Sequence, residues 1–282
     1  MLRYLEISVI FFLFLTGCKN KQNADIKEDI RVENDIKFDS IEVDVEYYLL
    51  GDTANPNCSL QSKFIYPAEY KDIETLEKIK MQFVVDFFGE DYRGLQPGEA
   101  IERYKNAYLT EYKKLEREFS RDPAEKSAYW YNYYESTNNE IIFNELNLIS
   151  YCVTLNCYTG GAHGSNGYNN RIIDLKSGNK LEEKDIFTDN FHDELTSIIV
   201  DELVRKFGLE NAAQLEDSVP IFNVSEISPN NNLLVDNEGI IYTYNEYEIA
   251  PYSVGKIDVL LPFDKIEHLL NKKSPVYQFV KQ

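Results

Sequence analysis

A glycine-rich segment near the middle of the chain carries the residue types best suited to chemistry. It runs from Tyr158 to Gly164 with the sequence YTGGAHG. Its glycines permit positive φ or a close approach of the backbone to a ligand, and His163 could act as a base or bind a metal. The alternative, which we favour, is a structural loop with His163 hydrogen-bonded to the backbone. A phosphate site would need a helix directly after the glycines, and the sequence predicts a strand there.

An aromatic run, Tyr129–Tyr134, is the second candidate. Aromatic faces stack on sugar rings, or alternatively pack inside a sheet. We favour packing, because alternation along a strand would not bring all five rings to one face. The 48 Asp and Glu residues are too many for a glycosidase-type pair to be singled out. The chain also lacks GxSxG, HExxH and P-loop motifs.

Three cysteines, Cys58, Cys152 and Cys157, lie in the body of the chain. Cys152 and Cys157 are five residues apart in one predicted strand, which separates them by about 16 Å and puts them beyond disulfide reach. A bridge would therefore join Cys58 to Cys152 or to Cys157, and three unpaired thiols are the alternative. The chain has no CxxC pair and three scattered histidines, so we predict no metal site and no cofactor.

Hydrophobic periodicity divides the chain into the elements that must position these residues. Alternation predicts a strand over 36–49, and an apolar stripe between Asp72 and Gly89 predicts a helix. A second helix is predicted to open at Pro97, and Asn138–Asn139 to turn the chain. Further strands are expected at 60–66, 141–158, 171–175, 221–227, 232–236, 240–248 and 257–261, and further helices at 188–207 and 264–270. The pattern predicts an α+β fold: antiparallel sheets with helices packed on one face, and two subdomains.

The first eighteen residues resemble a bacterial lipoprotein signal. The apolar run Ile7–Thr16, at about 1.5 Å per residue, is too short to cross a bilayer core of about 30 Å. It ends in a lipobox-like Leu-Thr-Gly-Cys at Cys18. We expect residues 1–17 to be a signal peptide, Cys18 to carry a membrane-anchoring lipid, and residues 18–35 to form a flexible tether. Residue 19 is Lys and not the Asp that retains lipoproteins at an inner membrane. We therefore expect the protein to lie in the cell envelope, anchored by lipid to the outer membrane and facing the periplasm or the cell surface.

The chain is strongly acidic, with 29 Lys and Arg against 48 Asp and Glu and a formal charge of −19. Phosphate contacts need a surplus of Lys and Arg, so nucleic acid is not an expected partner. An anionic lipid surface is disfavoured for the same reason. The charge suits either solubility alone or a cationic partner. Nothing in the sequence indicates an oligomeric state.

Several segments resemble the PdaC/RsiV-like superfamily. They are YTGGAH at 158–163, DLKSG at 174–178 with DIF at 185–187, YEIAPY at 247–252 with Gly255, LPF at 261–263, and Cys58 with Tyr66-Pro67 downstream. The resemblance spans roughly residues 36–272. It implies a PdaC-like α+β module over 36–180 and an RsiV-like C-terminal α+β module over 181–282.

The superfamily includes anti-sigma factors whose outer modules are receptors for lysozyme, and polysaccharide deacetylases. This sequence has no anti-sigma segment, no transmembrane helix and no deacetylase domain, so neither signalling nor deacetylation is expected. Together with the loop, the resemblance yields five candidate ligand-binding residues: Tyr158, Gly160, Gly161, His163 and Tyr252.

Two functions remain in competition. The first is a non-catalytic envelope lipoprotein that binds a cell-wall glycan such as peptidoglycan, or a cationic wall-cleaving enzyme such as lysozyme. The second is a hydrolase of cell-wall polysaccharide with a cleft near the GGAHG loop, in which His163 would meet an Asp or Glu. The sequence favours the first, although it does not decide whether the protein is an enzyme.

Overall fold

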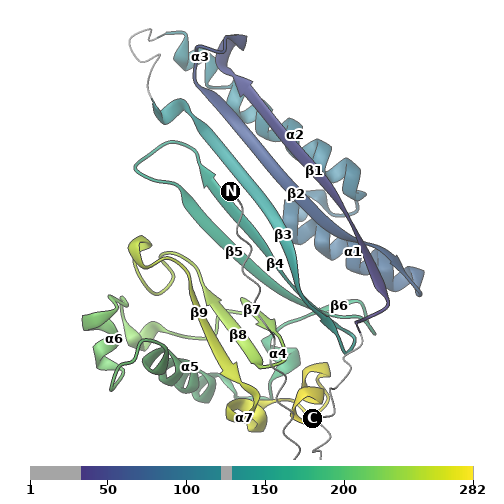
Figure 1. The fold of residues 1–282 in the computed structure, drawn as a ribbon, viewed down its shortest axis with the longest axis vertical. Helices are drawn as coiled ribbons and strands as arrows, with labels where there is room; N and C mark the ends of the chain where they lie inside the picture. The colour runs from purple at the N-terminus through teal and green to yellow at the C-terminus, as the bar shows by residue number, and fades with distance from the viewer. Residues whose placement is uncertain (1–32, 122–128, 282) are drawn as a thin grey trace, which may run out of the picture. The chain divides into compact units, whose positions relative to one another are not determined.

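The computed structural model describes residues 33–121 and 129–281. Its larger sheet has six strands in the order β1-β2-β3-β4-β5-β6 (Figure 1). Neighbouring strands run antiparallel except β2 and β3, which are parallel. The fold class is therefore the predicted α+β. The sheet differs from the prediction in one respect, because the pair β2–β3 is parallel whereas all strands were expected to be antiparallel. The strands are β1 (Ile36–Tyr48), β2 (Asn57–Tyr70), β3 (Tyr133–Glu145), β4 (Leu148–Tyr158), β5 (Ser165–Asp174) and β6 (Asn179–Leu181).

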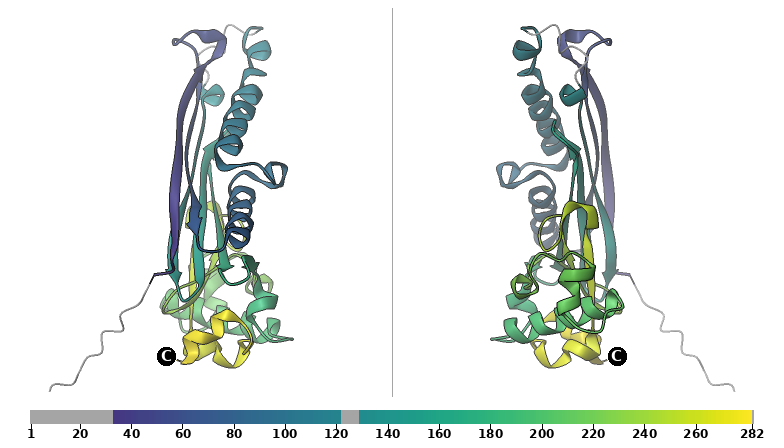
Figure 2. Two further views of the ribbon diagram at one scale, coloured as in Figure 1. Left: turned by 90° about the vertical axis from the view of Figure 1, so that its right-hand side faces the viewer. Right: turned by 90° about the vertical axis from the view of Figure 1, so that its left-hand side faces the viewer.

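The crossover between β2 and β3 places helices on one face of this sheet (Figure 2). They are α1 (Ile73–Phe88), α2 (Pro97–Lys113) and the short α3 (Glu116–Phe119). The Asp72 side chain caps α1 by accepting from the Thr75 backbone N–H at 2.8 Å, as the sequence predicted. Phe83 of α1 stacks on the fully buried Tyr151 of β4, with ring centroids 4.0 Å apart. This packing fixes α1 over the middle of the sheet.

The C-terminal part of the chain builds a second, three-stranded antiparallel sheet in the order β7-β8-β9. Its core is shared with the larger sheet, because Phe143, Leu148 and Ile172 belong to the same buried cluster as the residues of α5 and β8. All described residues therefore belong to one compact unit. The elements are α4 (Glu183–Ile186), α5 (His192–Lys206), α6 (Ala213–Ser218), β7 (Leu233–Val235), β8 (Gly239–Tyr244), β9 (Ile257–Pro262) and α7 (Phe263–Ile266).

Asparagine side chains from the C-terminal part complete the outer edge of β5. The Asn245 amide accepts from the Tyr168 N–H at 2.7 Å and donates to the Tyr168 carbonyl at 3.1 Å. Asn232 accepts from the Asn170 N–H at 2.7 Å and also donates to the Tyr168 carbonyl, at 3.0 Å. An edge strand exposes unpaired backbone groups that need partners. Here the amides replace a neighbouring strand, and they bring an asparagine-rich segment against the larger sheet.

The predicted turn at Asn138–Asn139 is wrong, because both residues lie inside β3. The buried Asn139 amide accepts from the Ile65 N–H at 2.7 Å and donates to the Ile65 carbonyl at 2.8 Å, which extends the β2–β3 pairing. The chain turns instead at Leu146 and Asn147, both with positive φ. The strand predicted at 221–227 is also wrong, since that segment holds a 3-10 turn, Val224–Glu226.

The possible disulfide between Cys58 and Cys152 or Cys157 is not formed, and all three thiols are free, which is the alternative that the sequence left open. Cys58 lies in β2 and the other two lie in β4, with β3 between these strands. Strands lie about 4.8 Å apart, so two strand spacings exceed the 7 Å limit for bridged Cα atoms. Burial raises the pKa of the Cys58 thiol to about 11, which keeps it protonated and unreactive.

The predicted signal peptide, Cys18 and most of the predicted tether lie outside the described residues. The last tether residues belong to the folded body, because the Asn34 side chain donates to Asn144 at 3.0 Å and to the Leu148 carbonyl at 2.9 Å. Any tether therefore ends before Glu33. Across the described ranges, no helix is both long and apolar enough to span a membrane.

Candidate functional site

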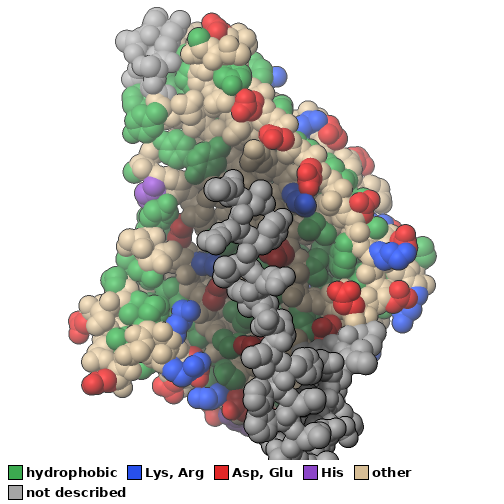
Figure 3. Space-filling view, viewed as in Figure 1, with side chains coloured by type: hydrophobic (Ala, Val, Ile, Leu, Met, Phe, Trp, Pro, Cys, Tyr) green, Lys and Arg blue, Asp and Glu red, His purple; other side chains and the backbone are tan. Residues whose placement is uncertain are grey.

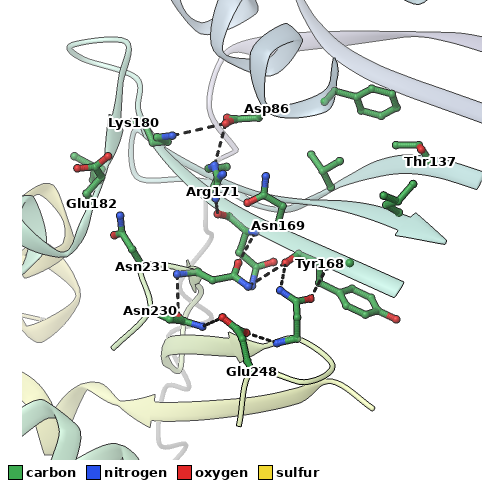
Figure 4. A pocket seen from close by; sticks show the side chains of 18 of the residues that line it. Asp86, Thr137, Tyr168, Asn169, Arg171, Lys180, Glu182, Asn230, Asn231 and Glu248 are labelled. Carbon is green, nitrogen blue, oxygen red and sulfur yellow. Dashed lines mark hydrogen bonds and ion pairs between the residues drawn. The ribbon is translucent and has the colours of Figure 1, made fainter. Parts of the chain in front are cut away.

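A polar cavity of about 540 Å³ opens on the helix-covered face of the larger sheet (Figure 4). Strands β3, β4 and β5 supply its floor. Helices α1 and α2 supply one wall, the segment from β6 into α4 supplies another, and the asparagine-rich segment closes the far side. The side chains with polar groups are Asp86, Tyr104, Thr137, Tyr168, Asn169, Asn170, Arg171, Lys180, Glu182, Asn230, Asn231, Asn232, Asn245 and Glu248.

One corner of the cavity holds a buried carboxylate with two cationic neighbours. The Asp86 side chain is only 6% exposed and accepts from Arg171 Nε at 3.0 Å and from the Tyr151 hydroxyl at 2.6 Å. Lys180 Nζ lies 3.7 Å from the same carboxylate. Arg171 Nη1 also donates to the Asn170 carbonyl at 2.6 Å. Asp86 therefore holds both cations at the cavity wall.

The opposite wall is built from amides and a carboxylate. Asn230 donates to the Thr243 carbonyl at 2.9 Å and to Glu248 at 3.2 Å. Asn169 points into the cavity from β5 (Figure 4), and its amide makes no hydrogen bond to any described residue. An amide has two donors and an acceptor with two lone pairs. Asn169 is therefore one polar group of this site that is free to bind a ligand.

Tyr104 and Thr137 close the end of the cavity beneath α2, and both contact the partly buried acid Glu135 behind them. Tyr104 of α2 lines the cavity and donates its hydroxyl to Glu135 of β3. Thr137 also contacts Glu135, at 3.3 Å. Burial raises the pKa of the Glu135 carboxyl, and the hydrogen bonds from Tyr104 and Thr137 only partly offset that rise. Burial likewise raises the pKa of Tyr104, which keeps this hydroxyl a donor.

Replacing Glu135 by Gln should stabilise the protein, and increasingly so at higher pH. Below about pH 4.5 the wild-type acid is protonated in both the folded and the unfolded state, so its ionisation contributes nothing. As the pH rises through the raised folded-state pKa, the wild type bears a growing cost of ionising a buried group. Glu135→Gln avoids that cost and keeps an acceptor for Tyr104. The difference in unfolding free energy, measured by urea denaturation from pH 4 to 8, should grow with pH; a constant difference would contradict the assignment.

The glycine-rich loop is an exposed turn whose side chains are held by hydrogen bonds. Gly160 and Gly161 have φ of 89° and 111°, as their residue type predicted. The Tyr158 hydroxyl donates to the Gly161 carbonyl at 2.9 Å. His163 Nδ1 lies 2.7 Å from the Gly164 carbonyl. The structure therefore places the His163 ring against backbone, in line with the structural interpretation of this loop.

His163 is also held by two tyrosines from the C-terminal part. Its ring stacks on Tyr252 with centroids 4.0 Å apart, and its Nε2 lies 3.2 Å from the Tyr247 hydroxyl. In this arrangement Nδ1 can donate to the Gly164 carbonyl, while Nε2 lies within hydrogen-bond distance of the Tyr247 hydroxyl. No carboxylate of the described residues contacts His163. The dyad that a hydrolase at this loop would need is therefore not formed in the described ranges.

None of the five ligand-binding residues proposed from the sequence lines the cavity. They contact one another or the neighbouring backbone instead. His163 meets Tyr252, Tyr158 meets Gly161, and Gly160 packs so closely that an added Cβ would lie 3.1 Å from the Trp130 carbonyl. The sequence reasoning missed the cavity residues. Their only local signal is the clustering of asparagines at 169–170 and 230–232.

The aromatic run has more than one environment. Tyr131 is buried, whereas Tyr129 and Trp130 are exposed and Tyr134 stacks on Tyr158 at 6.1 Å. Hydrophobic side chains gather on the surface around the loop that joins β4 to β5 (Figure 3). Packing in the sheet thus accounts for only part of the run.

In the described ranges no cluster of His, Cys, Asp and Glu could hold a metal ion.

Comparisons with known proteins identify the family. The sequence model described as "Protein of unknown function (DUF3298)" matches residues 184–264. A crystal structure of a DUF3298 family member from Bacteroides fragilis NCTC 9343 is 30% identical, with a TM-score of 0.83, and covers 89% of this chain and 100% of its own. A DUF3298 family protein from Pseudomonas aeruginosa PAO1 shares the fold at 12% identity, with a TM-score of 0.56 and coverage of 86% and 97%. No curated protein matches. The chain belongs to the DUF3298 family, whose function is unknown.

Proposed function

We propose that this protein is a non-catalytic envelope lipoprotein, anchored through Cys18, that binds a cell-wall glycan in the polar cavity. The carrying observation is a cavity of about 540 Å³ that presents the unpaired Asn169 amide. That volume lies within the usual range of small-molecule sites, about 300 to 1,000 Å³. Glycans carry many hydroxyl and acetamido groups, each of which needs a hydrogen-bond partner when it is buried. An amide-rich lining supplies such partners. The resemblance to the PdaC/RsiV-like superfamily supports the same location and ligand class.

The state of the cavity carboxylates favours binding over catalysis. Both oxygens of Asp86 are engaged, one by the Tyr151 hydroxyl and one by Arg171. A general acid or base must reach the substrate with a proton site that is free to exchange. Asp86 is committed to holding the wall, so a binding role suits the cavity better than hydrolysis.

The test is a calorimetric titration of the purified full chain with soluble peptidoglycan fragments. Asn169→Ala should weaken binding about 5-fold, because it removes a neutral hydrogen-bonding group worth about 1 kcal/mol. The unfolding free energy should stay nearly unchanged, since the amide has no partner in the described protein.

Asn138→Ala is the matched control. Asn138 is an exposed asparagine of the same sheet, on the face opposite the helices, and it should leave affinity unchanged. If wild type and Asn169→Ala bound the peptidoglycan fragments with equal affinity, the polar cavity would not be the glycan-binding site. Weakening by Asn138→Ala alone would move the site to the open face of the sheet.

A cationic wall-cleaving enzyme such as lysozyme is the second candidate partner. The edge strand β1 favours it, since its outward-facing residues include the exposed Asp39, Glu42, Asp44 and Glu46. Carboxylates with a few interspersed cations line this margin of the molecule (Figure 3). Lysozyme titrated under the same conditions should bind at low salt and lose affinity at high salt if this candidate is right.

A further inference from the structure

We infer that the glycan bound in the cavity carries a carboxylate, held at the corner formed by Asp86, Arg171 and Lys180. This inference rests on the proposed function and names the chemical class of its ligand. In Figure 4 the two cations converge on Asp86 at one end of the cavity, while Asn230 and Glu248 lie at the other.

Asp86, Arg171 and Lys180 together carry one net positive charge, because two cations share one carboxylate. Asp86 contributes one negative charge, and Arg171 and Lys180 contribute one positive charge each. Among the described residues, Glu182 also lines this corner, and it forms an ion pair with Lys184 at 2.6 Å. Lys184 offsets the charge of Glu182 from outside the cavity. A monoanion would neutralise the corner.

Arg171 and Lys180 also have hydrogen-bond donors at this corner that bind no described residue. Arg171 binds Asp86 through Nε and the Asn170 carbonyl through Nη1, and its Nη2 makes no hydrogen bond to the described residues. Lys180 approaches Asp86 only to 3.7 Å and so has hydrogen-bonding capacity left. The two side chains are 20% and 33% exposed, so both are accessible from the cavity yet partly shielded from water. A planar carboxylate suits guanidinium and ammonium donors arranged in this way.

The opposite wall argues against a doubly charged phosphate. Glu248 contributes a negative charge there and accepts from Asn230 at 3.2 Å. With one net positive charge at the corner and a carboxylate across the cavity, a dianion would meet more repulsion than a monoanion. The site thus suits a sugar acid whose carboxylate faces Lys180 and whose hydroxyl groups face Asn169.

The test compares three ligands on the full chain by calorimetry: an oligosaccharide containing glucuronic acid, its carboxyl-reduced neutral counterpart, and a sugar phosphate. The wild type should bind the acid about 10-fold more tightly than the neutral sugar, as one charge-assisted hydrogen bond allows. Lys180→Met should abolish that preference, because it removes the cation that binds the carboxylate. Lys63→Met, which removes an exposed lysine on the other face of the sheet, should preserve the preference.

The outcomes separate this inference from the proposed function. Equal affinity for acid and neutral sugar in the wild type overturns the inference alone, as does a preference that survives Lys180→Met. Tighter binding of the sugar phosphate also overturns the carboxylate assignment. Binding of no sugar overturns the inference and the proposed function together.

Discussion

Asp86→Ala is expected to lower the free energy of unfolding by about 3 to 5 kcal/mol, the cost of leaving a buried partner of an ion pair uncompensated. Arg171, whose side chain is 20% exposed, would lose its carboxylate, and the fully buried Tyr151 would lose the acceptor of its hydroxyl. The melting temperature should fall by about 6 to 20 °C for a protein of this size. Urea denaturation followed by circular dichroism measures the free energy directly.

Two further variants show whether this loss comes from the buried network. Asp86→Asn keeps an acceptor for Tyr151 and should lose clearly less stability than Asp86→Ala. Adding Arg171→Met to Asp86→Ala should recover part of the loss, because it removes the unpaired cation. If Asp86→Ala were as stable as wild type, the ion pairs of Asp86 with Arg171 and Lys180 would not stabilise the cavity wall. The net charge inferred for this corner would then also be unsupported.

Gly239→Ala should also be strongly destabilising, by about 3 kcal/mol, because the strand pairing leaves no room for a side chain. Gly239 opens β8 and pairs with Pro262 of β9. A Cβ at this position would lie 2.1 Å from the Leu261 carbonyl oxygen, and the obstacle is backbone, which cannot rotate away. We expect the variant to disturb the β8–β9 pairing and to unfold at lower urea concentration.

Gly98→Ala is the matched control for this prediction. Gly98 lies in the first turn of α2, and an added Cβ would have no atom within 4 Å apart from its chain neighbours and the backbone of its own helix. Alanine is a better helix former than glycine, by up to about 1 kcal/mol. Gly98→Ala should therefore leave stability unchanged or raise it. Equal effects of the two substitutions would show that the contact at Leu261 is not what constrains Gly239.

Local signals in the sequence predicted the elements whose stability is local. The Asp72 cap and the helical stripe predicted α1, and the alternation over 36–49 predicted β1. The parallel pairing of β2 with β3 escaped prediction, because strand partners depend on the whole crossover and not on either strand. Asn139 was misread as a turn residue for the same reason. Its amide has a role only once Ile65 of β2 lies beside it.

The candidate site was the hardest part to predict. Its floor lies on β3, β4 and β5, and its far wall begins at Asn230, 59 positions after the floor residue Arg171. Asn232 and Asn245 look like ordinary loop residues until the edge of β5 gives their amides partners. The loop from Tyr158 to Gly164 drew attention through its composition, and its glycines do adopt positive φ. That composition serves an exposed turn, in which His163 stacks on Tyr252.

The most direct test of the proposed site is hydrogen–deuterium exchange of the full chain with and without a desalted mixture of soluble peptidoglycan fragments. Backbone amides whose hydrogen bonds open less often exchange more slowly. We predict slower exchange on ligand addition in residues 167–171 and 230–232, with residues 39–46 of the edge strand β1 unchanged. Slower exchange confined to residues 39–46, or no change anywhere, would contradict the assignment of the cavity as the glycan-binding site.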